Sequence, residues 1–439
     1  GAASFVLGLF FVYFWSLHGA FNVIGSHYGT LESLSYDYIE LRLFPIDVSQ
    51  LYYRSIIYYS LFIVIMQLII LFFSESRQKL TAASANLTSP IEIDHYRVML
   101  VSGALILLST YLGWEVLSVS FSMGISAYVY LYQVAEEHSS LWLITDMMAV
   151  ITAVIGFSVA VTGREGRYIV GEYSRVKIFF YLCLLFLIIL FNISIGRKYA
   201  LFVGSVTGFL FYLTNAVRPS RSALVFLGLA ALTVLGFINI ARGGGGQDYG
   251  ANFSLLTLGQ IFLSIIYSNE AYAAHFSMYG ALHFHVPIEP WISFKVLVLS
   301  LVPAFFGMER PLGVYDLYAQ GVDASETMGF TIHHATGWYL NFGVIGIVIG
   351  AAILSGIWVT LYNRHCRLLF QRPRVTNIFW SVASSAFVAQ LPGLIRSGPE
   401  GYRGVFLAGI IVPAIILTLC SRPASSGFSV KNAKDIGAS

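Results

Sequence analysis

Two adjacent histidines, His333 and His334, stand in the sequence TIHHATGW, just before a long apolar run that begins near residue 339. Imidazole titrates near neutral pH, so a histidine in such a place is suited to take a proton from an attacking hydroxyl group. Either one is a candidate general base for glycosyl or acyl transfer, and the doublet leaves the assignment open. The alternative is an interfacial pair that only caps the start of the next helix. Four carboxylates upstream are rival bases or solvated loop charges: Glu309, Asp316, Asp323 and Glu326.

Arginines at the ends of apolar runs form the second set of candidates. The planar guanidinium group carries donors that match phosphate oxygens, so several arginines that converge would bind a diphosphate. Taken singly, each arginine is also explained as a side chain that snorkels to the lipid headgroups or pairs with a nearby acid. Their common position beside one long outer segment favours the diphosphate site. The arginines that the topology places outside are Arg197, Arg242, Arg310 and Arg396, with Lys198, Glu309, Glu326 and Arg403 as possible supporting residues.

The residue spacing does not predict a metal site. His283 and His285 could in principle hold zinc together with the histidine pair, but the sequence has no HExxH or CxxC motif. The three cysteines, Cys183, Cys366 and Cys420, lie far apart in or beside apolar runs. The sequence also lacks a GxGxxG, P-loop or GxSxG motif and an Asp-x-Asp pair in the outer loops. We therefore expect no cofactor and a reaction that is independent of metal ions.

The composition indicates the kind of domain that must position these residues. Of the 439 residues, 57% are hydrophobic and only 11% are charged, against about 25% charged in an ordinary soluble domain. Apolar runs of the roughly 20 residues needed to cross a bilayer recur from Phe5 to Leu419. The sequence predicts an all-α, polytopic transmembrane protein with a single membrane domain, 1–439, and excludes a soluble enzyme. The net charge of +3 comes without a basic tract, so we expect membrane lipids or membrane-delivered molecules as partners and no nucleic acid.

Hydropathy predicts ten firm spans and three ambiguous stretches. The firm spans are 2–21, 52–73, 98–114, 141–162, 177–195, 199–217, 222–240, 339–361, 376–392 and 403–420. The ambiguous stretches are 116–135, 254–280 and 291–306, which gives a total of about 10–14 spans. Lysine and arginine are retained on the cytoplasmic side, and they gather at 77–97, 164–177, 364–374 and in the C-terminal tail. Both ends of the chain then lie inside, provided that 116–135 is an interfacial or re-entrant helix.

One segment, 242–338, separates two firm spans by nearly a hundred residues, and the topology puts it on the outer face. It holds five of the ten histidines and seven carboxylates, so we expect the functional site there. Its apolar stretches are two short crossings or helices in the interface, where Trp291 and Lys295 would anchor at headgroup depth. Beyond it, the glycines at 343, 346 and 350 predict close packing between helices.

Four local motifs, taken in their order, resemble those of the Wzy-type polymerases of oligosaccharide repeat units. They are Gly196-Arg197-Lys198, Arg310-Pro311, the stretch TIHHATGWYLNFGVIG at 331–346, and Arg396-Ser397-Gly398. The likeness covers about 196–406, and the first half of the chain matches only as apolar spans. The histidine stretch also looks like that of the O-antigen ligases, which share the wider fold.

The resemblance implies a bacterial inner-membrane glycosyltransferase of the GT-C-like superfamily, with a large helical periplasmic loop at 242–338 and an active site that faces the periplasm. Such an enzyme would move the growing glycan from undecaprenyl diphosphate onto the next undecaprenyl-diphosphate-linked repeat unit. A flippase and a chain-length regulator are the protein partners that this role implies. The residues assigned by matching position are four arginines for the diphosphate and one histidine for catalysis: Arg197, Arg242, Arg310 and Arg396, and His333 or His334.

Three other functions stay open at this point. An O-antigen ligase would differ only in its acceptor, a lipid A core. A membrane-bound O-acyltransferase would need a cytosolic path for its acyl donor, which the outward placement of His333 opposes. A transporter of lipid-linked sugars usually has related halves with broken helices, and no internal repeat is visible in the sequence.

Overall fold

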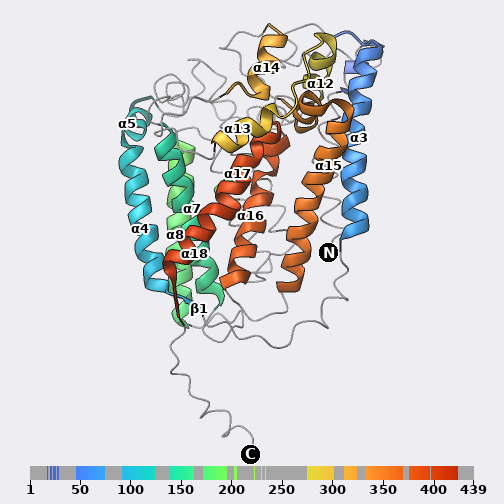
Figure 1. Cartoon of the computed structure of the whole chain (residues 1–439). Coiled ribbons are helices and arrows are strands. Elements are labelled where there is room, and N and C mark those ends of the chain that lie inside the picture. The colour runs from blue at the N-terminus through green and yellow to red at the C-terminus, as the bar shows by residue number, and fades with distance from the viewer. Residues whose placement is uncertain are drawn as a thin grey trace, which may run out of the picture.

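The computed structural model describes residues 46–74, 91–123, 139–162, 172–194, 274–300, 311–323, 332–368, 375–395 and 397–423, with scattered positions at 17–28, 202–204, 222, 229 and 233. In these ranges the protein is a bundle of helices that lie side by side (Figure 1). Five helices are long and apolar enough to cross a membrane: Gln50–Phe73, His95–Leu112, Arg175–Ile193, His334–Arg364 and Pro399–Cys420. Two shorter apolar helices, Ile144–Ala160 and Ile378–Leu391, accompany them. The predicted helical, multi-pass fold is confirmed in the described part of the chain.

The elements run in the following order. The first half contributes α3 (Gln50–Phe73), β1 (Ile91–Ile93), α4 (His95–Leu112), α5 (Trp114–Met123), α7 (Ser139–Thr162) and α8 (Glu172–Ser194). Three short helices follow, α12 (Ala274–His283), α13 (Ile292–Ser300) and α14 (Val314–Gly321). The last part contains α15 (His334–Leu368), α16 (Val375–Ile395), the 3₁₀ turn η4 (Pro399–Gly401), α17 (Tyr402–Phe406), the π-helical turn η5 (Leu407–Ile411), α18 (Val412–Cys420) and β2 (Ser421–Pro423).

Seven of the ten firm spans match described helices: α3, α4, α7, α8, α15, α16 and the run from α17 to α18. The other three predicted spans, 2–21, 199–217 and 222–240, lie outside the described residues apart from scattered positions. The total of about 10–14 spans therefore stays a prediction.

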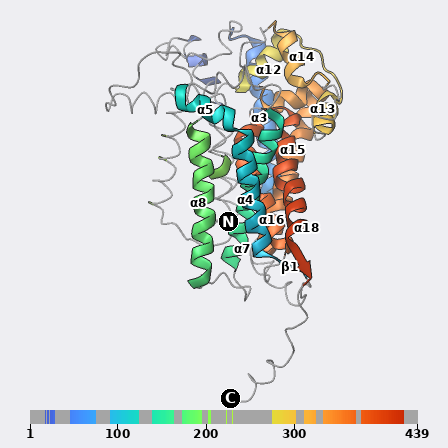
Figure 2. The same ribbon diagram turned by 90° about the vertical axis from the view of Figure 1, so that its left-hand side faces the viewer.

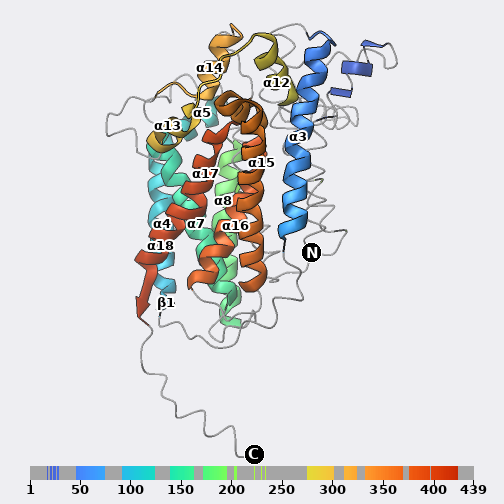
Figure 3. The ribbon, with the colours of Figure 1, turned by 45° about the vertical axis from the view of Figure 1, so that its right-hand side comes forward.

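The bundle has two distinct ends (Figures 1 and 3). The short helices α12, α13 and α14 lie at one end together with the start of α15, which we call the histidine end. The strands β1 and β2 lie at the opposite end, which we call the ribbon end. The described helix termini next to the basic segments, such as Phe73, Thr162 and Leu368, lie at the ribbon end. The described parts of the predicted outer loop lie at the histidine end (Figure 1).

The ambiguous stretches lie at the histidine end where they are described. Figure 2 shows α5 lying obliquely there, where it extends from the end of α4 over the end of α8. The described parts of the other two stretches are α12, with 10 residues, and α13, with nine. Residues 254–273 and 301–306 lie outside the described residues, so the choice between short crossings and interfacial helices stays open. The side chain of Trp291, just before α13, is 57% exposed, and the anchoring role of Trp291 and Lys295 stays a prediction.

Two apolar cores run along the bundle and meet at α16. One face of α16 packs Ala383 and Phe387 with residues of α3 and α15. The opposite face packs Val382 and Ala386 with residues of α4, α7, α8 and α18. A third cluster joins α3, α12 and α14 at the histidine end. Helix α16 thus holds the two halves of the bundle together.

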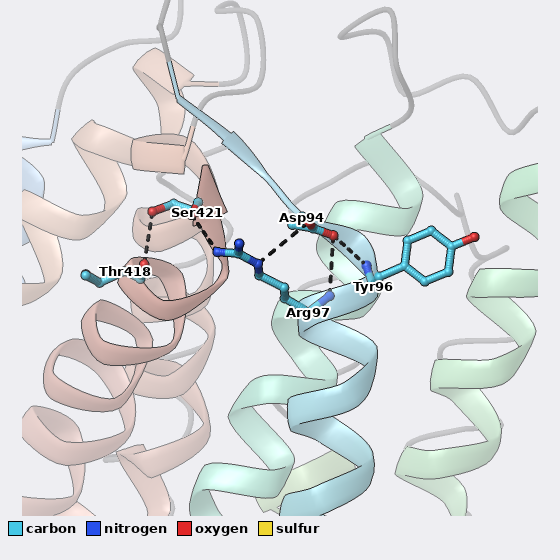
Figure 4. Close-up of polar contacts among 5 residues, drawn as sticks. All are labelled: Asp94, Tyr96, Arg97, Thr418 and Ser421. Carbon is cyan, nitrogen blue, oxygen red and sulfur yellow. Dashed lines mark hydrogen bonds and ion pairs between the residues drawn. The ribbon is translucent and has the colours of Figure 1, made fainter. Parts of the chain in front are cut away.

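The ribbon end is closed by contacts between α4 and the C-terminal strand (Figure 4). Strands β1 and β2 pair antiparallel with Glu92 opposite Arg422. Asp94 caps α4 by accepting hydrogen bonds from the amides of Tyr96 at 3.0 Å and Arg97 at 3.4 Å. The Arg97 guanidinium lies 3.8 Å from the Asp94 carboxylate and donates to the carbonyl of Ser421 at 3.5 Å. A side-chain cap is one of the few ways to satisfy the first amides of a helix, and it fixes where α4 begins.

Helix α15 is broken into two parts. Phe342 and Gly343 leave the helical conformation, and Gly343 has φ +63° and ψ −147°, a region that essentially only glycine adopts. The amide of Glu289 donates to the carbonyl of Leu340 at 2.9 Å, which satisfies a backbone group that the break would leave unpaired. His334 is the first residue of α15, and His333 directly precedes it. The first part of the helix, 334–341, which we also call the histidine part, lies across the top of the long second part in the view of Figure 3.

The break changes the role of the predicted glycine ladder. A methyl group on Gly346 would collide with the carbonyl of Trp338, and one on Gly350 would collide with the Trp338 indole ring. The close contacts at these two glycines are therefore made with the first part of the same helix, where the sequence predicted another helix. The glycines make room for Trp338, which is 1% exposed.

Candidate active site

The predicted histidines lie in the interior of the histidine end. His333 and His334 are both 0% exposed, at the start of α15, and His275 of α12 is equally buried. The rings of His333 and His334 pack edge-on against Phe62 of α3. Four elements that are far apart in the sequence, α3, α12, α15 and the turn 397–402, meet around them.

His334 uses both of its ring nitrogens. Its Nδ1 lies 2.9 Å from the carbonyl oxygen of Ser397, so Nδ1 carries the proton and donates it. Its Nε2 lies 3.1 Å from the indole Nε1 of Trp338 and 3.0 Å from the hydroxyl of Tyr402. Indole nitrogen only donates, so Nε2 is the acceptor of the neutral ring. The hydrogen bonds hold His334 in one tautomer and one orientation.

His333 is held through its backbone and its ring. Its amide donates to the hydroxyl of Ser277 at 2.9 Å, and its Nδ1 accepts from the amide of Ala335 at 3.0 Å. The proton of the neutral ring is therefore on Nε2. The ring centroid lies 4.3 Å from that of Tyr59. Burial lowers the pKa of His333 well below its usual value, and the neighbouring imidazoles of His334 and His275 act in the same direction.

His275 ties α12 to α3 beside this pair. Its Nε2 lies 3.2 Å from the hydroxyl of Tyr52, and the two rings make an edge contact. The hydroxyl of Ser277, two residues further along α12, lies 2.9 Å from the hydroxyl of Thr336. Helix α12 thus supports the histidine part of α15 through Ser277 and packs against α3 through His275.

The turn that follows α16 approaches the first part of α15 closely. A methyl group on Gly337 would collide with the Cα of Gly398 and lie 2.9 Å from Cδ of Pro399. Because both positions are glycine, Ser397 can reach His334 with its carbonyl group. Two of the four motifs from the sequence, the histidine stretch and Arg396-Ser397-Gly398, are therefore in contact at Ser397 and Gly398.

The rival bases upstream have different positions. The carboxylate of Asp316 accepts from the amide of Gly313 at 2.7 Å and so caps α14. Asp323 is exposed beyond the end of α14 and has φ +53°. Glu309 and Glu326 lie outside the described residues.

Most of the predicted diphosphate ligands also lie outside the described residues: Arg197, Lys198, Arg242, Arg310 and Arg396. Arg403 is described and half-buried, and it follows Tyr402, the partner of His334. The convergence of the arginines stays a prediction.

The partners of His334 were not foreseen from the sequence. Trp338 stands four residues after His334, so helical periodicity could have placed the two on one face. Tyr402 and the carbonyl of Ser397 are 68 and 63 residues away, and a backbone acceptor has no sequence signature.

Within the described ranges, no three histidine, cysteine, aspartate or glutamate side chains form a group that could hold a metal ion. His283 and His285 are exposed, and the Nδ1 of His285 lies 3.1 Å from the carbonyl of His283. Independence from metal ions remains an expectation.

Comparisons of the chain with protein-family models, with curated proteins and with solved structures give no match.

Proposed function

We propose that this protein is a bacterial polysaccharide polymerase of the Wzy type. It transfers the growing glycan from undecaprenyl diphosphate onto the next undecaprenyl-diphosphate-linked repeat unit, at the outer face of the inner membrane. In this proposal the histidine end faces the periplasm, the segment 242–338 is a periplasmic loop, and the fold is GT-C-like.

The observation that supports the proposal best is the contact between the histidine stretch and the turn 397–401, which we call the outer turn because the proposal places it at the periplasmic face. His334 and Ser397 are joined by a hydrogen bond of 2.9 Å, although 63 residues separate them. Ser397 directly follows Arg396 in the sequence, which is one of the arginines assigned to the diphosphate. The histidine stretch and the residue that follows Arg396 are therefore in contact, which supports a proposal that assigns chemistry to both motifs.

The proposed chemistry requires two functions of these residues. Negative charge builds up on the diphosphate as the bond from its oxygen to the anomeric carbon breaks, and preorganised guanidinium groups in a low-dielectric site stabilise that charge. The acceptor hydroxyl must lose its proton to a base as its oxygen attacks the anomeric carbon. Arg197, Arg242, Arg310 and Arg396 are proposed for the first function, and His333 or His334 for the second.

The decisive experiment gives the purified protein, in detergent, an undecaprenyl-diphosphate-linked oligosaccharide repeat. A polymerase produces a ladder of longer lipid-linked chains. A ligase, the nearest alternative because it shares the histidine stretch, leaves the repeat unchanged until a lipid A core is supplied. Failure to extend or transfer glycan with either acceptor would refute the glycosyltransferase and would leave the acyltransferase and transporter alternatives.

Arginine variants test the site itself. Arg197→Ala and Arg310→Ala are expected to abolish long chains while protein levels stay near normal. Arg→Lys at the same positions should restore activity only in part, because a point charge replaces a planar fork. Arg97→Ala is the matched control, since Arg97 is an exposed arginine at the ribbon end. Chains of wild-type length in the first two variants would contradict the diphosphate site.

A further inference from the structure

A chain of buried hydrogen bonds crosses from the break in α15 to the outer turn. Asn341 is the last residue of the first part of α15 before Phe342, and Ser293 belongs to α13; both are 0% exposed. Glu400 stands in η4, three residues after Ser397. These three side chains are linked in that order and connect four elements, α15, α13, η4 and α14.

The donors and acceptors fix the direction of the chain. The Asn341 side-chain amide donates to the hydroxyl of Ser293 and to the carbonyl of Gly337, each at 2.7 Å. Its Oδ1 accepts from the amide of Ser293 at 3.2 Å. The Ser293 hydroxyl, which accepts from Asn341, lies beside the carboxylate of Glu400 and has its own proton to offer to it. The same carboxylate accepts from the amide of Val314, the first residue of α14, at 2.6 Å.

The chain completes a closed circuit around the contact of Gly337 with Gly398. On one side of this contact, His334 bonds to the carbonyl of Ser397. On the other side, Asn341 reaches Glu400 through Ser293. The first part of α15 is therefore held to the outer turn at both of its ends, at His334, three residues before Gly337, and at Asn341, four residues after it.

This arrangement does more than fill a core. A buried amide side chain has two N–H donors and one carbonyl oxygen to satisfy, and a bond to the carbonyl four residues earlier uses only one of the donors. The remaining groups need partners outside the helix. Ser385 shows the simpler case, because its hydroxyl donates to the carbonyl of Ser381, four residues earlier in its own helix. Asn341 and Ser293 instead connect two helices to a carboxylate that belongs to the outer turn. The break at Gly343 removes the restraint that a continuous helix would provide, and the circuit replaces it.

We propose that Asn341 and Ser293 are positioning residues of the active site, which hold the histidine part of α15 in register with the outer turn 397–401. The inference rests on the proposed function, because the site that they position is the proposed glycosyl-transfer site. They act through Glu400 and Ser397 and make no contact with the substrate.

The first arm of the test measures the coupling directly and needs no activity. Amide hydrogen exchange is followed by mass spectrometry in the wild type, in Asn341→Ala and Ser293→Ala, and in the control Ser385→Ala. Loss of one buried link should speed exchange by about tenfold or more, both in the first part of α15 and in the segments 397–401 and 313–316. The control changes a buried serine whose hydroxyl bonds only within α16, and it should leave these segments unchanged.

The second arm measures the extension of the lipid-linked repeat. Because a displacement of about 1 Å can cost on the order of a hundredfold in rate, we expect kcat to fall by about ten- to a hundredfold in Ser293→Ala, while KM stays near the wild-type value. Ser293→Thr keeps the hydroxyl group and should recover most of the lost kcat. A merely structural role would lower the amount of folded enzyme without this split between kcat and KM and without rescue by threonine.

The outcomes separate the two proposals. Faster exchange confined to the immediate neighbours of the substituted residue, with 397–401 unchanged, would overturn the positioning role whatever the activity. Equal kcat in Ser293→Ala and Ser385→Ala would overturn it as well. If the wild type extends no glycan, the proposed function fails, and the exchange arm alone still decides whether the circuit holds α15 to the outer turn.

Discussion

Replacement of Gly337 by alanine tests the contact on which the site depends. Gly337 lies in the first part of α15, between His334 and Asn341, and faces the backbone of Gly398. An added methyl group would lie 2.9 Å from Cδ of Pro399 and closer still to the Cα of Gly398. Neither neighbour is the end of a flexible side chain, so the backbone of the turn or of α15 must move.

The size of the effect follows from this geometry. An ordinary van der Waals contact begins at 3.4 Å, so relief of both contacts needs a displacement of about 1 Å, enough to cost on the order of a hundredfold in rate, or about 2.7 kcal/mol. The same movement stretches the bond between His334 and Ser397, now 2.9 Å. Overpacking of this kind also lowers the free energy of unfolding by about 1–3 kcal/mol.

The assay compares Gly337→Ala with Gly356→Ala in the same helix. A methyl group on Gly356 meets no atom within 4 Å, so this control should keep wild-type activity and gain about 0.5–1 kcal/mol of stability from helix propensity. Chain extension and thermal unfolding in detergent are measured for both variants. A Gly337→Ala protein that extends glycan at the wild-type rate, with an unchanged melting temperature, would refute the role given to this contact.

Three further predictions concern stability. Folding lowers the pKa of His333, so as the pH falls below about 6.5 the unfolded chain binds a proton at this residue before the folded protein does. We therefore expect the free energy of unfolding to reach its full value above that pH and to fall by up to about 1.4 kcal/mol per pH unit below it. Thermal unfolding at several pH values should show a smaller slope for His333→Gln, and equal slopes would contradict the assignment. Asp94→Ala should lower the free energy of unfolding by about 1 kcal/mol, because the helix cap is lost. Arg97→Gln removes an ion pair whose arginine side chain is 55% exposed, so it should lower that free energy by less than about 1 kcal/mol. A larger loss for Arg97→Gln than for Asp94→Ala in chemical denaturation would contradict this prediction. Gly343→Ala should cost about 1–3 kcal/mol because φ +63° is strained for alanine, and a melting temperature equal to that of Gly356→Ala would count against the break in α15.

Hydropathy was sufficient to predict the long helices but could not locate the break in α15. Residues 339–361 are mostly apolar and carry no charge. The mean hydropathy of this window therefore predicts one continuous span and does not show that the helix is interrupted at Phe342. The signal was present in the glycines, but the sequence predicted contacts with another helix for them. Their contact partner is Trp338 of the same helix. Trp338 reaches these glycines because the chain changes direction at Gly343, which adopts a positive φ.

The site was predictable in part for a related reason. The histidine pair could be found because its residue types have recognisable chemistry and because it precedes a span. Its partners could not be found, since a carbonyl group such as that of Ser397 is common to every residue, and Ser293 and Glu400 become neighbours of Asn341 only once α13 lies across the histidine end. The sequence motifs identify which segments meet; the hydrogen-bond directions come from the fold.

Those directions bear on which histidine could act as the base. In the neutral state the acceptor nitrogen of His333 is bonded to the amide of Ala335, and that of His334 is bonded to Trp338. Either ring could accept a proton only after the bond to its acceptor nitrogen lengthens.

For His333 the donor is a backbone amide two residues away on the same turn, which cannot leave without unwinding the start of α15. For His334 the donors are side chains, Trp338 and Tyr402, and Nε2 can accept a proton once the Trp338 indole shifts and the Tyr402 hydroxyl rotates. Neither movement unwinds the helix. Proton transfer at His334 therefore needs the smaller rearrangement. We expect His334→Gln to abolish chain extension and His333→Gln to retain part of it, which single-turnover assays of the two variants would measure. The opposite order would assign the base to His333 and would require the start of α15 to unwind when substrate binds.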